Sequence, residues 1–120
     1  MSCPICRDEA LLVAEQAFER RLERYRRLGH DREAAARWVV DAAGPLASPV
    51  LDIGTGKGIL AVELARRGLA VTSIDPCRQD QLLAARRAER AWCAAAISFV
   101  AGTVEALEVT GGSFGAAAMM

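Results

Sequence analysis

The sequence has no excess of charge and almost no histidine. Its 15 basic and 15 acidic residues cancel to a net charge of zero. A general nucleic-acid binder or a protein of anionic membrane surfaces would carry a basic surplus, so we expect neither nucleic acid nor membrane among its partners. The single histidine, His30, lies in a Gly-His-Asp connection, where a solvated loop residue is expected. No Ser/His/Asp or Cys/His catalytic pair is therefore predicted.

Long apolar segments are also missing. No run of 18 or more apolar residues occurs, so no membrane span is predicted. The first ten residues, MSCPICRDEA, lack the apolar core of a secretory signal, and we expect a cytoplasmic protein. In that compartment the four cysteines are expected as free thiols rather than disulfides.

One pair of cysteines, Cys3 and Cys6, has a recognisable C-x-x-C spacing. Such a pair is half of a zinc site or a redox motif, and a structural zinc ion needs four ligands. The other candidates, Cys77, Cys93 and His30, are scattered along the chain. We therefore expect a flexible terminal pair and no metal site, with metal or redox use of this pair as the alternative.

Residues 1–47 predict two helices. Apolar residues recur at spacings of three and four over residues 8–28, and Gly29 is placed to end this helix. Asp31 is expected to cap a second helix over about residues 32–43, which Gly44-Pro45 would stop. The predicted apolar stripes are Leu11, Ala14, Phe18, Leu22 and Tyr25 in the first helix, and Ala35, Trp38, Val39 and Ala42 in the second.

From residue 48 onward, predicted strands alternate with predicted helices. This alternation implies right-handed crossovers and an α/β fold, a parallel sheet with helices on both faces. A Gly111-Gly112 turn precedes the last strand. The strands are expected over residues 50–53, 70–74, 97–101 and 114–119; the helices are expected over 59–67 and 79–93, with Leu82, Ala85, Ala88 and Trp92 on the apolar side of the second.

The segment VLDIGTGKGILAVELARRGLAVTSIDP, residues 50–76, joins a strand, a glycine-rich turn, a helix and a second strand that ends on a carboxylate. Glycines let a ligand approach the backbone, and the following helix presents unpaired N–H groups. Asp75 follows Gly54 by 21 residues, a separation typical of a carboxylate that accepts hydrogen bonds from ribose hydroxyls. The segment predicts a nucleotide site, the alternative being a simple turn in an α/β protein.

The spacing of the glycines excludes two common nucleotide motifs. Both the dinucleotide fingerprint and the P-loop require glycine where Ile59 stands. The pattern instead is D-x-G-x-G-x-G, from Asp52 to Gly58. A carboxylate at Asp52 would repel a pyrophosphate, and it suits a ligand with a cationic end.

Several stretches together resemble one family. LDIGTGKGILAVELAR followed by VTSIDP resembles motif I and the next acidic strand of class I S-adenosylmethionine-dependent methyltransferases. FVAGTVEAL and GSFGAAAMM resemble the segment after strand three and the fourth strand of the small-molecule branch, so the resemblance spans residues 48–120. It implies a Rossmann-like sheet in the order 3-2-1-4, S-adenosyl-L-methionine as cofactor, and direct attack of a small-molecule nucleophile on the sulfonium methyl.

The resemblance also implies roles for particular residues. Asp52 would hold the loop and orient the amino end of the cofactor. Thr103 stands where an Asp is commoner in the family, and Gly115 replaces the usual Asp of the fourth strand. No catalytic base is predicted. The cofactor-binding residues would be Gly54, Thr55, Gly56 and Gly58 under the methionine part, together with Asp52, Asp75 at the ribose, and Thr103 and Val104 against the adenine.

The family fold has three further strands, so the resemblance implies a partial domain. We expect a helical cap over residues 1–47 and an apparently truncated cofactor-binding half-domain over residues 48–120. Its fourth strand would be an apolar, unpaired edge, which invites a homo-oligomer or a partner chain. A non-catalytic interaction module that pairs with such a partner is the main alternative function, and a metal or redox protein built on Cys3 and Cys6 is the second.

Overall fold

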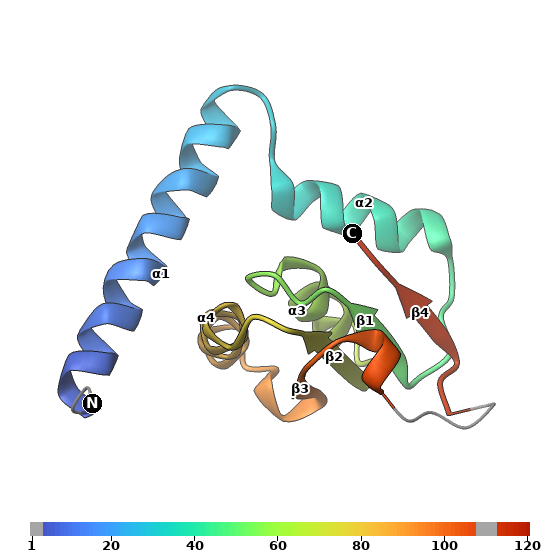
Figure 1. The fold of residues 1–120 in the computed structure, drawn as a ribbon. Coiled ribbons are helices and arrows are strands. Elements are labelled where there is room, and N and C mark those ends of the chain that lie inside the picture. Colours follow the sequence, from blue (N-terminus) through green and yellow to red (C-terminus); the bar gives the residue numbers. More distant parts are fainter. Residues whose placement is uncertain (1–3, 108–112) are drawn as a thin grey trace.

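The computed structural model of the chain describes residues 4–107 and 113–120, with side chains from residue 9 onward. Cys3 and the predicted Gly111-Gly112 turn lie outside the described residues, and of Cys6 only the backbone is described. The elements, shown in Figure 1, are α1 (Pro4–Arg27), α2 (Arg32–Ala43), β1 (Val50–Ile53), α3 (Ile59–Arg66), β2 (Val71–Asp75), α4 (Arg78–Arg90), the 3-10 helix η1 (Ala94–Ala96), β3 (Ile97–Ala101), the 3-10 helix η2 (Val104–Ala106) and β4 (Ala116–Ala118).

Four parallel strands form one sheet in the order β3-β2-β1-β4, which confirms the expected order and the α/β class. Asp52 lies opposite Ser73 in the register, and Ser73 lies opposite Phe99. Because all four strands run the same way, their carboxyl ends meet at one edge, where a ligand crevice is expected in open α/β sheets. β4 is shorter than the predicted strand over residues 114–119.

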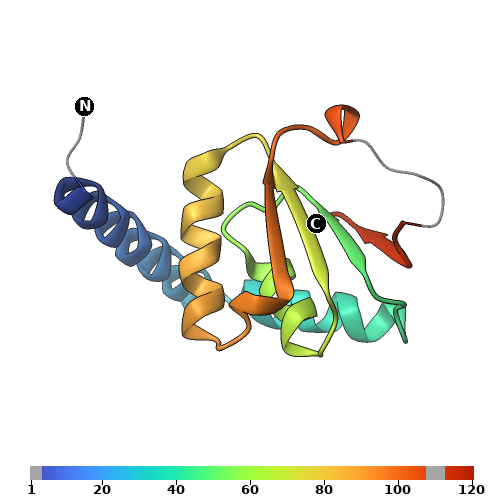
Figure 2. The ribbon, with the colours of Figure 1, turned by 90° about the horizontal axis from the view of Figure 1, so that it is seen from below.

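The core lies between one face of the sheet and helices α2, α3 and α4. Val50, Val71 and Ile97 on the strands pack with residues of all three helices, among them Val40 and Leu64. The expected helices on the other face are absent from the described residues: Figure 2 looks onto that face and shows the strands in front of α2 and α3. The reason is topological. The two crossover connections, β1-α3-β2 and β2-α4-β3, are right-handed and move across the sheet in the same direction. Their helices α3 and α4 therefore pack on the same face of the sheet.

The capping residues act as predicted, but two helix faces differ. The Asp31 Oδ1 atom accepts a hydrogen bond from the Ala34 N–H at 2.9 Å and begins α2 where expected. The buried residues of α2 are Ala36 and Val40, whereas Trp38, expected in the core, is 71% exposed. A helix buries the side that meets its neighbour, which for α2 is α3. Apolar residues occur on most sides of α2, so its sequence alone does not show which side is buried.

A similar correction applies to α4. Its buried residues are Gln81, Leu83, Ala84 and Ala88, so Ala88 of the predicted stripe is confirmed, whereas Leu82 and Ala85 are only partly buried. Trp92, also expected in the core, is 95% exposed. It follows the end of α4 and has a φ angle of 61°, so helical periodicity no longer places its side chain.

Helix α1 stands beside the sheet next to α4 (Figure 1). Its predicted stripe is confirmed, with Phe18 and Leu22 buried. Charges also join it to α4: the Glu15 carboxylate, 8% exposed, pairs at 2.6 Å with both Arg86 and Arg90. No helix in the described part of the chain combines the length and apolar character needed to cross a bilayer.

Candidate functional site

The glycine loop joins β1 to α3 at the carboxyl edge of the sheet. Gly56 has a φ angle of 52° and Gly58 one of 91°, conformations that favour glycine. A Cβ at Gly58 would also lie only 2.7 Å from the Ala84 Cβ, so α4 leaves no room for a side chain there. A Cβ at Gly54 or Gly56 would meet no atom within 4 Å, which leaves the surface of the loop open to a ligand.

Asp75 ties the loop to the end of the second strand. Its Oδ2 atom accepts a hydrogen bond from the Gly56 N–H at 3.1 Å, and its Oδ1 atom accepts one from the Cys77 N–H at 2.7 Å. Each carboxylate oxygen can accept a further hydrogen bond. Asp75 is therefore held in place by backbone and still able to bind hydroxyl groups.

The segment after β3 meets the same edge. The Gly102 N–H donates to the Asp75 carbonyl oxygen at 3.0 Å, which places the exposed Thr103 and Val104 beside the end of β2. The predicted residues of the loop, of β2 and of this segment thus come together along three neighbouring strand ends.

Asp52 does not share that open edge. Its side chain is 1% exposed and lies beneath the loop, where its Oδ2 atom accepts a hydrogen bond from the Ser73 hydroxyl at 2.7 Å. The Ser73 hydroxyl lies 2.6 Å from the Thr55 hydroxyl. On the far side of Thr55, the Gln81 amide nitrogen lies 3.4 Å from the Thr55 hydroxyl and donates to the Val100 carbonyl at 2.7 Å.

These four side chains form a hydrogen-bond chain with one direction. The Gln81 Nε2 atom can only donate, and the Ser73 hydroxyl hydrogen is used on Asp52, so Thr55 must donate to Ser73. The chain ends at the Asp52 Oδ2 atom, while the Asp52 Oδ1 atom has no hydrogen-bond partner among the described residues. Burial raises the pKa of Asp52 to about 6, the Ser73 hydrogen bond opposes this rise, and the charge of Asp75 adds to it.

Sequence reasoning missed Ser73 and Gln81. Ser73 could have been found, because it is a polar residue within an apolar strand and parallel pairing with β1 puts it next to Asp52. Gln81 carried no comparable signal, since a glutamine in an Arg-rich helix is normally solvated.

A cavity of about 160 Å³ lies between the glycine loop and the N-terminal helices. Tyr25 is not among its lining residues; its ring meets His30 edge-on at a centroid distance of 6.1 Å. The lining residues are Gly54, Thr55, Gly56, Lys57, Ile59 and Leu60 of the loop and α3, with Phe18, Arg21, Arg32 and Met120.

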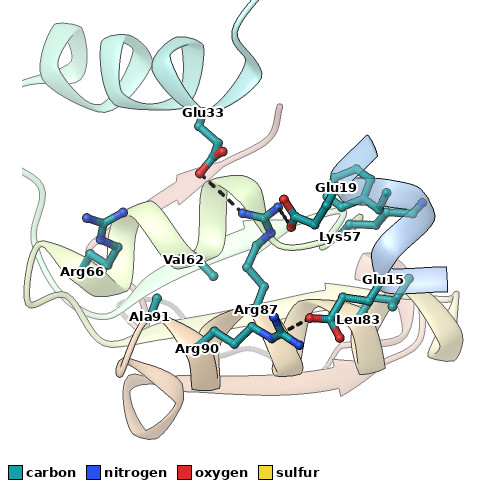
Figure 3. A pocket seen from close by; sticks show the side chains of 11 residues that line it. Glu15, Glu19, Glu33, Lys57, Val62, Arg66, Leu83, Arg87, Arg90 and Ala91 are labelled. Atoms are coloured by element: carbon teal, nitrogen blue, oxygen red, sulfur yellow. Dashed lines mark hydrogen bonds and ion pairs between the residues drawn. The ribbon is translucent and has the colours of Figure 1, made fainter. Parts of the chain in front are cut away.

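Phe18 separates this cavity from a second one of about 320 Å³ between α1, α3 and α4. Figure 3 shows that acidic and basic side chains project into the second cavity together. Arg87 pairs with Glu19 at 2.7 Å and with Glu33 at 3.5 Å. Ion pairs with arginines thus hold all three acidic side chains that line the second cavity, Glu15, Glu19 and Glu33.

No cluster of three or more metal-ligating side chains occurs among the residues whose side chains are described. Cys77 and Cys93 are free thiols. The predicted use of Cys3 and Cys6 falls outside the described side chains.

Comparisons with known proteins agree on this part of the chain. The profile of a family described as Methyltransferase domain matches residues 50–120. A ubiquinone biosynthesis O-methyltransferase of Methylocella silvestris is 39% identical over 71 residues, which are 59% of this chain and 27% of that protein. This chain therefore spans about a quarter of the length of that relative.

Two solved structures have the same fold. An S-adenosylmethionine-dependent methyltransferase from Thiobacillus denitrificans, in complex with S-adenosyl-L-homocysteine, is 31% identical with a TM-score of 0.58, over 71% of this chain and 35% of its own. Another from Geobacter sulfurreducens, also in complex with S-adenosyl-L-homocysteine, is 28% identical with a TM-score of 0.61, over 70% of this chain and 34% of its own.

Proposed function

Because this chain belongs to the methyltransferase domain family, we propose that it binds S-adenosyl-L-methionine and takes part in methyl transfer to a small-molecule acceptor. The observation that carries the proposal is the continuous edge formed by the glycine loop, Asp75 and the segment beginning at Thr103. The two similar structures from Thiobacillus and Geobacter hold S-adenosyl-L-homocysteine, the product form of this cofactor.

The residues present fit this cofactor. The open surface over Gly54 and Gly56 accommodates its methionine part, and the carboxylate of Asp75 has free lone pairs for the ribose hydroxyls. The Thr103 hydroxyl and the Val104 side chain, both exposed, would meet the adenine. Once bound, the cofactor supplies an activated methyl group, and the protein contributes proximity and alignment.

Asp52 is proposed as a positioning residue. Because it is buried beneath the loop, it acts on a ligand through Ser73 and Thr55 and not by direct contact. Gly58 has a related role, since it lets α4 approach the loop closely enough for Gln81 to reach Thr55.

The glycine at position 115, where the family usually has an aspartate, has a steric explanation. A Cβ at this position would collide with the backbone and side chain of Ala47. An aspartate therefore does not fit at Gly115 in this chain, and the proposed site works without that carboxylate.

We further propose that residues 1–47 act as a cap on the cofactor-binding part, residues 48–120, and that the protein works in the cytoplasm. The cavity lined by Arg21, Arg32 and the glycine loop supports the first proposal, and the free thiols of Cys77 and Cys93 suit a reducing compartment. Among the described strands, β4 pairs only with β1, so we also propose that its other edge pairs with a second copy or a partner chain.

Calorimetric titration with S-adenosyl-L-homocysteine tests the main proposal. Asp75→Ala should weaken binding about ten-fold or more, because it removes a charged acceptor of two hydrogen bonds. Asp41→Ala is the matched control, since Asp41 pairs with Arg67 away from the cavity. Absence of binding by the unaltered chain, or equal affinity in the Asp75 variant, would refute the proposal.

A further inference from the structure

Helix α1 carries a buried carboxylate that no step of the proposed function uses. Glu15 is 8% exposed, and its two oxygens lie 2.6 Å from two guanidinium groups of α4, those of Arg86 and Arg90. One turn further along α1, Glu19 pairs with Arg87 of α4 at 2.7 Å. Because a buried carboxylate without its partners is strongly unfavourable, we expect the attachment of α1 to depend on these ion pairs.

Apolar packing adds only a short stretch to this attachment. Phe18 and Leu22 of α1 are buried, whereas Val13 is 62% exposed. Helices with little buried apolar surface open more readily than core helices such as α3. The ion pairs with α4 therefore decide how often α1 opens.

Phe18 extends the attachment of α1 to the glycine loop. Two cations lie over its buried ring, with the Arg87 guanidinium carbon 5.3 Å and the Lys57 Nζ atom 5.5 Å from the ring centre. Both distances are within the range of a cation–π interaction. Lys57 belongs to the loop, and its Nζ atom also lies 3.4 Å from the carboxylate of Asp80 in the first turn of α4. One aromatic ring thus connects α1 with both α4 and the loop.

We propose that Phe18 and Lys57 are positioning residues that couple the docking of α1 to ligand binding at the glycine loop. A Lys57 side chain held between Phe18 and Asp80 restricts the backbone of the loop, so a ligand that needs the ordered loop binds at a smaller cost in entropy. Such a coupling is reciprocal, because the factor by which docked α1 raises the affinity is the factor by which the ligand favours docking. The ligand side of the coupling rests on the proposed function.

Glu15→Gln tests the coupling from outside the cavity at the loop. The change keeps the shape of the side chain but removes the charge that two arginines of α4 bind, so α1 should open and its backbone amides should exchange with deuterium about ten-fold faster or more. The Kd for S-adenosyl-L-homocysteine in calorimetric titrations should rise about three- to ten-fold. Glu9→Gln is the matched control, because Glu9 is exposed on the same helix, and it should change neither quantity.

The side chain of Lys57 reports on the loop directly. It is the only lysine of the chain, so selective labelling gives a single side-chain signal, which the ring current of Phe18 shifts upfield. Phe18→Leu keeps an apolar side chain but removes the ring, so the shift should disappear and the Kd for S-adenosyl-L-homocysteine should rise as in Glu15→Gln. Phe18→Tyr keeps the ring, and its hydroxyl can extend into the cavities that Phe18 lines, so it should restore both.

Reciprocity supplies a check on the unaltered chain. Amide exchange reports the rare open state of α1, so saturating S-adenosyl-L-homocysteine should slow exchange in α1 by the same factor, about three- to ten-fold. Equal exchange with and without the ligand would contradict the coupling.

The outcomes separate this inference from the proposed function. If Glu15→Gln opens α1 and Phe18→Leu removes the Lys57 shift, but both variants bind S-adenosyl-L-homocysteine as tightly as the unaltered chain, the inference fails while the proposed function survives. If Glu15→Gln leaves exchange in α1 unchanged, the ion pairs do not hold the helix and the inference fails as well. If the unaltered chain does not bind S-adenosyl-L-homocysteine, both fail.

Discussion

Two kinds of polar side chain hold the glycine loop: the partly exposed Asp75, which accepts from the Gly56 N–H, and the buried Ser73 and Asp52 beneath Thr55. The resemblance implied that Asp52 holds the loop and orients the amino end of the cofactor, and the structure places it beneath the loop as the acceptor end of a hydrogen-bond chain. The D-x-G-x-G-x-G pattern was enough to predict the glycine loop and the acidic residue before it, because both depend on local spacing. It could not give burial, which depends on β2 and α4 meeting around Asp52.

The raised pKa of Asp52 predicts a specific dependence of stability on pH. The folded state binds this proton more tightly than the unfolded state, since the pKa is about 6 when folded and 3.8 for an ordinary Asp. The contribution of Asp52 to stability is thus fully present below about pH 4 and is lost as pH rises through about 6, by up to about 2–3 kcal/mol. Urea unfolding at several pH values measures this, and Asp52→Asn should remove that part of the pH dependence. An identical pH profile in the variant would contradict the prediction.

Gln81 is expected to stabilise both the sheet and the loop. Gln81→Leu leaves the Val100 carbonyl and the Thr55 hydroxyl without its amide, so we expect a loss of about 1–3 kcal/mol in the free energy of unfolding. Gln79→Leu is the matched control, because Gln79 is exposed on the same helix. If chemical denaturation shows equal losses in the two variants, Gln81 does not have this role.

The helices and strands follow from local patterns, whereas the direction in which a helix faces does not. The Asp31 cap, Gly44 and the strand β1 are local features, and each was predicted correctly. Trp38 and Trp92 were assigned to the core because they lie on apolar sides of predicted helices, yet both are exposed. An alanine-rich helix offers several apolar sides of similar strength, and tertiary packing selects among them.

The contact between α3 and α4 depends on Gly58. Gly58→Ala and Gly29→Ala both place a side chain at similar φ angles, 91° and 88°, but only Gly58 has a neighbour, Ala84, within contact distance. Both should destabilise the fold, by about 1 kcal/mol for the backbone strain alone. Gly58→Ala should cost about 1–3 kcal/mol more because of the collision. Thermal unfolding compares the two, and equal losses would show that the close approach is unimportant.

For the molecule as a whole, the order of the strands was predicted by resemblance, but the absence of a described helix from the second face of the sheet was not. Leu51, Ile53 and Ile74 alternate with the core residues Val50 and Val71 and so point away from α2, α3 and α4. Leu51 and Ile74 are nevertheless buried, with only 7% and 2% of their surface exposed. The crossover rule alone would have placed α3 and α4 on one side. The remaining connection, after β3, carries only the short η2 among its described residues.

The open edge of β4, which pairs only with β1 among the described strands, predicts self-association. Unpaired strand edges of this kind favour contact with other chains. Light scattering coupled to size-exclusion chromatography should therefore show species larger than the 12.8 kDa chain. Ala117→Lys puts a charge on the exposed part of β4 and should shift the distribution toward monomer. A chain that stays monomeric at all concentrations would contradict this prediction.

The central claim is that a ligand lies along the carboxyl edge of the sheet, over the glycine loop. Backbone amide chemical shifts recorded during titration with S-adenosyl-L-homocysteine test it most directly. We predict the largest shifts at Gly54, Gly56, Asp75 and Thr103, with little change at Glu15 and Arg90 in the second cavity. Unchanged amides at the loop, or shifts centred on the second cavity, would contradict the account.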